Sequence, residues 1–575
     1  MVKREPVPVK VTGRFDFSVR NLGPLALLNH ILKEMKIREI VNEYCPADPR
    51  LEVPVGDVIH AMAANRLCSP QPLLHVAQWA EESGSIFLLG TPAEALNDDR
   101  LGRTLDAVFM NRWNILAEVA LHVSQKFDVS LSKVHYDPTS FHFTGEYNNQ
   151  CESASLIPEI RPFRIEVGRH ALPGEHIKEA QVGVNLAEDG KGPVPFFYHS
   201  ADGKDNGHGA VAKNLQNLLK YVKPKYLLMV TDRGCFSAGL AVQLVRKHKF
   251  HFISSVTWKE EYANLYDMKK PKMQEASFLS LKEKRKRESG LPEDTWERYF
   301  IGEIPYQISH ENQSIRARLI FVRSTADIKV CQKTREKYTA KILKGLEQIK
   351  TTVENGRTTE VRKVHKKVSD LYGKKQAQKY FTCNVESIES EEIKTLAPRR
   401  KGQRKPKLKF SFRYDVKLAE KDASYDGLYG LATSLPKKTH TTDDVFTAFK
   451  EQHHIETAHH QWKAPIRLRP LFLKRVKRLE SLIFVQFLAL MAFYLIQRLY
   501  RLAKAESCKT TAETLIRHFA FCPIAFRYEK SFTQVVPSAL SPVQADVLKT
   551  LGFPSVDEQI QKYVIPQVKE PGEKN

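Results

Sequence analysis

The sequence predicts an α/β core that is interrupted by a mixed α+β insertion domain and preceded by a helical module. Three observations lead to this fold class. Apolar residues near the N-terminus recur at helical spacing, strand-like segments then alternate with helices, and after residue 257 the pattern loosens into a long polar stretch. The predicted segments are a helical domain 1–125, a first core part 126–257, an insertion 258–423, a second core part 424–500 and a C-terminal region 501–575.

The first segment is expected to be helical. Leu28, Ile31, Leu32 and Met35 follow the spacing of one helix face, and the run Asn97-Asp98-Asp99-Arg100 offers an N-cap for a later helix. Nothing in this segment carries chemistry by itself. We interpret it as a packing or positioning module.

The α/β pattern rests on short apolar runs that are separated by turns and helices. The predicted strands are 134–137 with a continuation to 143, 181–186, 194–198, 226–230 and 250–256, and the predicted helices between them are 210–221 and 237–248. The insertion then brings a polar helical stretch, 333–372, and a basic run between residues 399 and 409. Strand character returns at 428–433, followed by helices to about residue 501.

The charge of the chain favours a polyanionic partner. Lys and Arg together number 89 against 66 Asp and Glu, which gives a net charge of +23. Each phosphate that such a surface neutralises releases a counterion, so nucleic acid is the expected partner.

The cysteines and the apolar segments bear on the compartment. The eight cysteines are scattered without a CxxC pair, which argues against a zinc ribbon or a disulfide framework and suits a reducing cytoplasm. Residues 1–6 lack the apolar region of a signal peptide. The apolar run Leu482–Ile496 is shorter than the ~20 residues that a membrane span needs, so a buried core helix is predicted.

Three carboxylates stand where phosphodiester chemistry would need them. Asp137 and Asp232 are each predicted to close a strand of the same α/β block, which sets them side by side at one sheet edge. Glu456 would come from a helix packed over that edge, and Lys463, seven residues on, shares its helix face. Carboxylates that converge from separate elements can hold two hard divalent cations for phosphoryl transfer.

A basic stripe follows Glu456. Its members are expected to bind DNA phosphates, and they are Lys463, Arg467, Arg469, Lys474, Arg475, Lys477 and Arg478. No acidic residue interrupts the stripe.

These motifs resemble the insertion-sequence transposases of the DDE type, which have an RNase H-like core and a YREK signature. The resemblance rests on His135-Tyr136-Asp137-Pro138-Thr139-Ser140, on Val230-Thr231-Asp232-Arg233-Gly234, and on Ile455-Glu456 with Lys463. The Asn97–Arg103 run and the long gap between Asp232 and Glu456 are also similar to the family.

The resemblance implies an enzyme that cuts transposon ends and joins their 3′-OH groups to target DNA. It implies two Mg²⁺ ions, with Mn²⁺ as a substitute, held by Asp137, Asp232 and Glu456. It further implies terminal inverted repeats as substrate, a synaptic homodimer and a prokaryotic cytoplasm near the nucleoid. The Tyr and Arg of the signature align with Phe449 and Gln452, which removes one phosphate contact.

Other interpretations remain open. The chain could be a DNA-binding descendant that has lost catalysis, or a metal-dependent nuclease without strand transfer. His453, His454, His459 and His460 suggest zinc, but no full ligand set appears, and a DNA-facing surface is the favoured interpretation. Cys235 beside Asp232 is interpreted as a small packed side chain and not as a nucleophile.

Overall fold

The computed structural model describes residues 16–46, 52–147, 161–168, 177–205, 207–373, 376–388, 407–463, 473–504, 508–529, 532–537 and 539–560. The chain is mixed α/β and forms two compact units. The first unit contains Met1–Ser254, Ser309–Gln313 and Ala448–Asn575, and the second contains Ser255–Ile308 and Ser314–Thr447. Each unit is described by itself.

The N-terminal part of the first unit is helical, as predicted, after one short strand. Its elements are β1 (Asp16–Asn21), α1 (Leu25–Glu34), α2 (Ile37–Tyr44), α3 (Val55–Cys68), α4 (Val76–Ser83), α5 (Ile86–Leu89), α6 (Asp98–Val108) and α7 (Arg112–Lys126). The expected cap is present, because the side chain of Asn97 accepts a hydrogen bond of 2.9 Å from the backbone N–H of Arg100. Buried apolar residues line α1, α3 and α7, so these helices share one core.

A sheet follows these helices and confirms the predicted strands. Its strands are β2 (Lys133–Phe143), β3 (Glu166–Val167), β4 (Lys178–Ala187), β5 (Val194–Ala201), β6 (Leu228–Thr231) and β7 (His251–Val256). The order is β5–β4–β2–β6–β7, and β3 pairs with the start of β4. β4 runs antiparallel to both of its neighbours, β5 and β2, whereas β2, β6 and β7 are parallel. The connecting helices are α9 (Gly207–Asn217) and α10 (Ala238–Val242), each extended by a π-helical turn.

The C-terminal part of the first unit returns to the N-terminal helices. It comprises α18 (His453–Lys463), α19 (Val476–Lys504), α20 (Ala512–His518), β14 (Pro523–Glu529), β15 (Phe532–Pro537), α21 (Pro542–Leu551) and α22 (Val556–Ile560). Strand β14 lies between β1 and β15 in a three-stranded sheet, which joins the two ends of the described chain.

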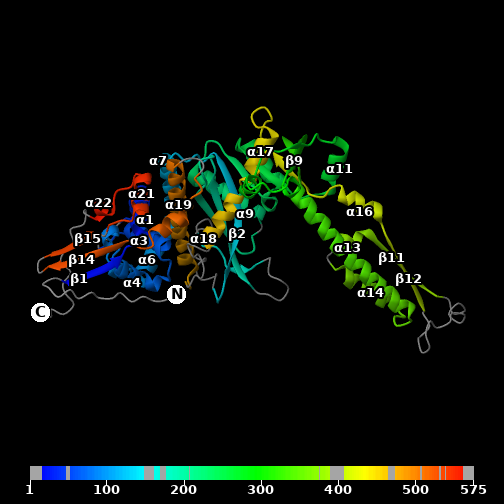
Figure 1. The fold of residues 1–575 in the computed structure, drawn as a ribbon, viewed down its shortest axis with the longest axis horizontal. Coiled ribbons are helices and arrows are strands. Elements are labelled where there is room, and N and C mark those ends of the chain that lie inside the picture. The colour runs from blue at the N-terminus through cyan, green and yellow to red at the C-terminus, as the bar shows by residue number, and fades with distance from the viewer. Residues whose placement is uncertain are drawn as a thin grey trace. The chain divides into compact units, whose positions relative to one another are not determined.

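Helix α19, coloured orange in Figure 1, is the central helix of this unit. It contacts α3, α6 and β5. By length and composition it could cross a membrane, but the whole of its most apolar window is buried inside the protein. The predicted core helix at Leu482–Ile496 is therefore confirmed.

Two buried ion pairs fix α19. Arg112 of α7 donates from Nε and Nη2 to Oε1 of Glu480, at 3.1 and 2.9 Å, and both side chains are buried. Ser200 and the backbone N–H of Phe163 also donate to this carboxylate. Arg498 makes a bidentate pair with Asp189 at 2.7 and 2.8 Å. Four hydrogen bonds to the Glu480 carboxylate offset the cost of burying its charge.

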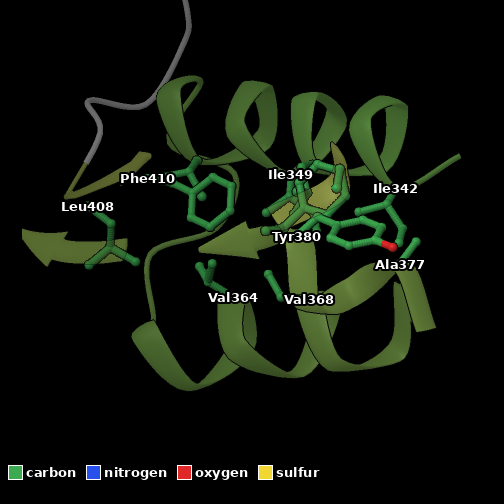
Figure 2. Packing of buried hydrophobic residues seen from close by; sticks show 12 residues of the cluster. Ile342, Ile349, Val364, Val368, Ala377, Tyr380, Leu408 and Phe410 are labelled. Carbon is green, nitrogen blue, oxygen red and sulfur yellow. The ribbon is translucent and has the colours of Figure 1, made fainter. Parts of the chain in front are cut away.

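The second unit holds α11 (Glu260–Lys269), β8 (Gln274–Glu275), α12 (Leu281–Glu288), β9 (Tyr299–His310), β10 (Gln313–Ser324), α13 (Thr325–Glu354), α14 (Val361–Tyr372), β11 (Phe381–Ser387), β12 (Leu408–Tyr414), α16 (Val416–Ala423), β13 (Leu428–Thr433) and α17 (Thr442–Lys450). Four of its strands follow the order β13–β10–β9–β8. The hairpin β11–β12 packs on α13 and α14 around a separate core that includes Ile342, Ile349, Val364 and Phe410 (Figure 2). The division of the chain into five segments remains a prediction.

Candidate functional site

Asp137 lies in β2, and Asp232 directly follows β6, the parallel neighbour of β2. In the β2–β6 register Tyr136 is paired with Thr231, and each aspartate is the next residue along the chain. The predicted adjacency of the two carboxylates therefore agrees with the sheet. One detail of the prediction was wrong, because Asp137 does not close its strand. The predicted continuation to Phe143 belongs to β2 itself, since β4 pairs with β2 well beyond the end of β6.

The Asp232 carboxylate is exposed at the end of β6. Its Oδ1 accepts a hydrogen bond of 2.7 Å from the backbone N–H of Arg233, which begins a short 3₁₀ turn. The backbone carbonyl of Asp232 accepts a hydrogen bond from Ser254 of β7 at 3.3 Å. The backbone is thus held on both sides while the carboxylate faces outward.

Helix α18 carries the third carboxylate. Ile455, Ala458, His459 and Trp462 are buried, and their spacing gives α18 one face that packs on β2 and β4. Glu456 lies beside this face and is exposed, and Lys463 follows two turns later. The helix begins only at His453, because residues 451 and 452 form a turn after α17. Phe449 and Gln452, at the Tyr and Arg positions of the signature, therefore lie outside α18.

The negative charges of Asp232 and Glu456 both act on the Asp137 carboxyl. The pKa of Asp137 is raised from 3.8 to about 7, first by burial and then by the negative charges of Asp232 and Glu456. The ammonium of Lys463 opposes this shift. Asp137 therefore lies within the field of both other carboxylates and of the lysine, although the four residues come from β2, from the end of β6 and from α18.

Lys463 is held over the continuation of β2. Its Nζ donates a hydrogen bond of 2.5 Å to Oγ1 of Thr139, and it lies 5.6 Å from the ring centroid of Phe141. Asp137, Thr139 and Phe141 alternate along β2 and so share one face of the strand. Thr139 stands in the motif around Asp137 but was not predicted as a site residue. Its period-2 spacing from Asp137 was a signal that could have placed it there.

His459 corrects the interpretation of the histidine group as a DNA-facing surface. Its ring is buried by the packing of α18 on the sheet, which lowers its pKa to about 3 and keeps the imidazole neutral. Nδ1 lies 3.6 Å from Oδ2 of Asp137, and the ring bonds the backbone of the same residue. The contact is therefore a polar one and not an ion pair. His453 and His460 are exposed, as expected.

A second set of polar contacts anchors the start of α18. Lys133 of β2 forms a 2.6 Å ion pair with Glu451, and Nδ1 of His454 lies 2.8 Å from Oε2 of Glu188. Burial alone raises the pKa of Glu188, but the contact with His454 is among the interactions that bring it below its ordinary value. These contacts connect α18 to strand β2 and to the residue that follows β4.

Cys235 is buried, as predicted for a small packed side chain. Burial, together with the charges of Asp137 and Asp232, raises the pKa of its thiol. The thiolate is strongly disfavoured, which argues against a nucleophilic role.

The predicted basic stripe is only partly within the described structure. Arg467 and Arg469 lie outside the described residues. Arg478 donates to Oδ2 of Asp106 on α6 at 3.0 and 2.7 Å, so its guanidinium already has an anionic partner. Lys474 and Arg475 are exposed, and Lys477 lies over the ring of Phe109. Asp106, which is far from the stripe in sequence, could not be anticipated as its neighbour.

The donors at the site suit a hard divalent cation. Carboxylate oxygens are the ligands that Mg²⁺ prefers, and here three carboxylates lie near one lysine that can face a phosphate. Within the described residues, no group of three or more His, Cys, Asp or Glu side chains is arranged closely enough to hold a metal ion. The fit therefore rests on donor chemistry and on the nearness of Asp232 and Glu456 to Asp137, whose pKa their charges help to raise.

Comparison with known proteins adds one finding. Residues 17–121 match a family model described as "Domain of unknown function (DUF4277)". The match covers β1 and helices α1 to α6 with most of α7, and does not reach Asp137, Asp232 or Glu456. No curated protein matches the chain. The comparisons thus identify a domain in the N-terminal helical part of the first unit. They give no information on the reaction that Asp137, Asp232 and Glu456 would support.

Proposed function

We propose that the protein is a DNA transposase of the DDE type. The observation that carries the proposal is the meeting of Asp137 and Asp232 on neighbouring parallel strands, together with the electrostatic coupling of Glu456 to Asp137. Three carboxylates from separate elements beside a lysine and within a basic chain suit phosphodiester chemistry better than any other reaction class.

Each residue has a role in this proposal. Asp137, Asp232 and Glu456 would hold two Mg²⁺ ions, with Mn²⁺ as a substitute. Those ions, when bound, would supply an activated oxygen nucleophile and stabilise the leaving oxygen. Lys463 would bind a phosphate beside the carboxylates, since its Nζ is held on the same face of β2 as Asp137. Neutral His459 would keep α18 close to the Asp137 backbone.

The architecture supports the same proposal. We propose an RNase H-like core made from the sheet β5–β4–β2–β6–β7 with α18. An insertion domain would lie between Asp232 and Glu456, and the second compact unit falls in that interval. The cysteines in the described part of the chain are free, which supports a reducing cytoplasm. A homodimer that pairs two transposon ends completes the proposal.

The decisive experiment uses a labelled duplex that carries the DNA flanking the coding region. Full-length protein is incubated with this duplex and a target plasmid in Mg²⁺, beside Asp232→Asn and the matched control Asp99→Asn. Asp99 is an exposed carboxylate on α6 that pairs only with Arg103 among the described residues. Cleavage and joining should occur with the wild type and with Asp99→Asn, and both should fall by at least ~10³-fold in Asp232→Asn.

The outcomes separate the alternatives. Metal-dependent cleavage without joining would identify a nuclease. Tight binding with no cleavage in Mg²⁺ or Mn²⁺ would identify a non-catalytic descendant and would give weight to Phe449 and Gln452. Equal activity of Asp232→Asn and wild type would show that the Asp232 carboxylate takes no part in the reaction.

A further inference from the structure

The long helix α13 of the second unit carries a row of lysines on one face. Lys333, Lys337, Lys341 and Lys344 follow spacings of four, four and three residues, and all four are exposed. At 100° per residue they fall within a sector of about 80°, and at 1.5 Å per residue they extend over about 16 Å. We call these four residues the lysine row.

The lysine row faces away from the core of the unit. The buried residues of α13 are Ile342, Leu346, Ile349 and Val353, which pack on α14 and on the β11–β12 hairpin (Figure 2). Their mean direction lies about 150° around the helix from the lysine row. In addition, no described residue between 325 and 341 is buried, so the N-terminal half of α13 is largely open to solvent.

The pattern differs from that of an ordinary solvated helix face. A helix that needs only solubility gains stability from Glu and Lys at i and i+4, whereas like charges at this spacing destabilise it. Lys333, Lys337 and Lys341 repeat at i and i+4. The other side chains of α13 within this sector are uncharged: Ala326, Val330, Gln348 and Thr351. Glu336 and Glu347 stand three residues after Lys333 and Lys344, on one flank of the row. Lys337 and Lys341 have no acidic residue three or four positions away on α13.

We propose that the lysine row binds the phosphate backbone of duplex DNA. A line of ammonium groups on a straight helix matches a line of phosphates, and a bound polyanion removes the repulsion among the lysines. Such contacts position the duplex without reading its sequence. This surface extends the proposed function, since DNA is its substrate, but it contains none of the carboxylate residues.

The test is a salt titration of DNA binding in EDTA, so that catalysis plays no part. The probe is a fluorescent 40-base-pair duplex of arbitrary sequence. The full-length variant carries Lys→Gln at all four positions of the lysine row, because Gln and Lys have similar helix propensity. A matched control carries Lys→Gln at four exposed lysines elsewhere: Lys225, Lys247, Lys438 and Lys549.

The log–log slope of affinity against salt should fall by about 2 to 4 in the lysine-row variant, because each lost phosphate contact removes about 0.9. The control should change the slope by less than about 1. A second variant with Lys→Arg at the same four positions should bind like wild type, which separates lost charge from a folding defect. If the predicted change in slope is found but the full-length protein neither cleaves nor joins DNA, the proposed catalytic function fails and the proposed role of the lysine row stands.

Equal slopes for the lysine-row variant and the control would overturn the proposal. The same is true if the variant loses affinity for duplex RNA or for phosphatidylserine vesicles while its DNA affinity is unchanged, since the partner would then be another polyanion.

Discussion

The raised pKa of Asp137 makes a prediction about stability. Asp137→Asn keeps the shape of the side chain and removes its charge. In the folded protein the pKa of this carboxyl is about 7, against an ordinary value of 3.8. The folded state thus holds the proton more tightly than the unfolded state, and ionisation of Asp137 destabilises the fold as the pH rises from about 4 to 7.

The magnitude follows from the same two values. The difference between a pKa of about 7 and one of 3.8 corresponds to at most about 4 kcal/mol at pH 8. The Asp137 side chain is 29% exposed, so solvent screening reduces the expected effect to about 2 kcal/mol. Asp137→Asn should therefore be more stable than wild type at pH 8 in EDTA, with less than half of this advantage at pH 5.

The assay is urea unfolding of both proteins at pH 5 and pH 8, followed by tryptophan fluorescence. Trp462 is buried on α18 and packs against Phe141 of β2, so it reports on the relevant unit. Mn²⁺ should reverse the order, because a bound cation stabilises only the protein with an intact carboxylate set. Asp99→Asn, on an exposed carboxylate of the same unit, should gain no stability at either pH.

A free energy of unfolding of Asp137→Asn equal to or below that of the wild type at pH 8 in EDTA would refute this prediction. It would mean that neither burial nor the charges of Asp232 and Glu456 disfavour the ionised Asp137 in the folded protein. If Asp137→Asn is more stable than wild type in EDTA but Mn²⁺ does not stabilise the wild type, the electrostatic explanation stands and the proposed metal site is wrong.

Three further predictions concern the elements around the site. Lys133→Glu should lower DNA cleavage at least ~10-fold by detaching the start of α18, and the charge swap Lys133→Glu with Glu451→Lys should restore most of it in the same assay. His459→Ala should lower the free energy of unfolding by about 2 kcal/mol, because it leaves a cavity and removes the bond to the Asp137 backbone, and it should reduce cleavage more than His459→Gln does. Arg112→Met should cost about 3 to 5 kcal/mol in urea unfolding because it leaves Glu480 buried without its counterion, and adding Glu480→Gln should recover part of that loss; no recovery would contradict the ion-pair explanation.

The sequence was sufficient where the determinants are local. Apolar runs predicted strands β4, β5, β6, β7 and β13 within a few residues, because burial on both sides of a sheet produces continuous apolar segments. The buried helix α19 followed from its length, and the cap of α6 followed from Asn97. The adjacency of Asp137 and Asp232 was also predictable, since each follows a short strand-like run of one α/β block.

Tertiary structure decided what depends on contacts between distant segments. The continuation of β2 past Asp137 was predicted, but no local signal in β2 marks β4 as the strand that pairs with it there. His459 is buried and neutral because α18 packs on the sheet, whereas the exposed His460 next to it has the same residue type. Arg478 bonds Asp106, which lies more than 300 residues earlier in the chain. Charge pattern and residue type are properties of the sequence, but exposure, pairing and pKa depend on which surfaces the fold brings together.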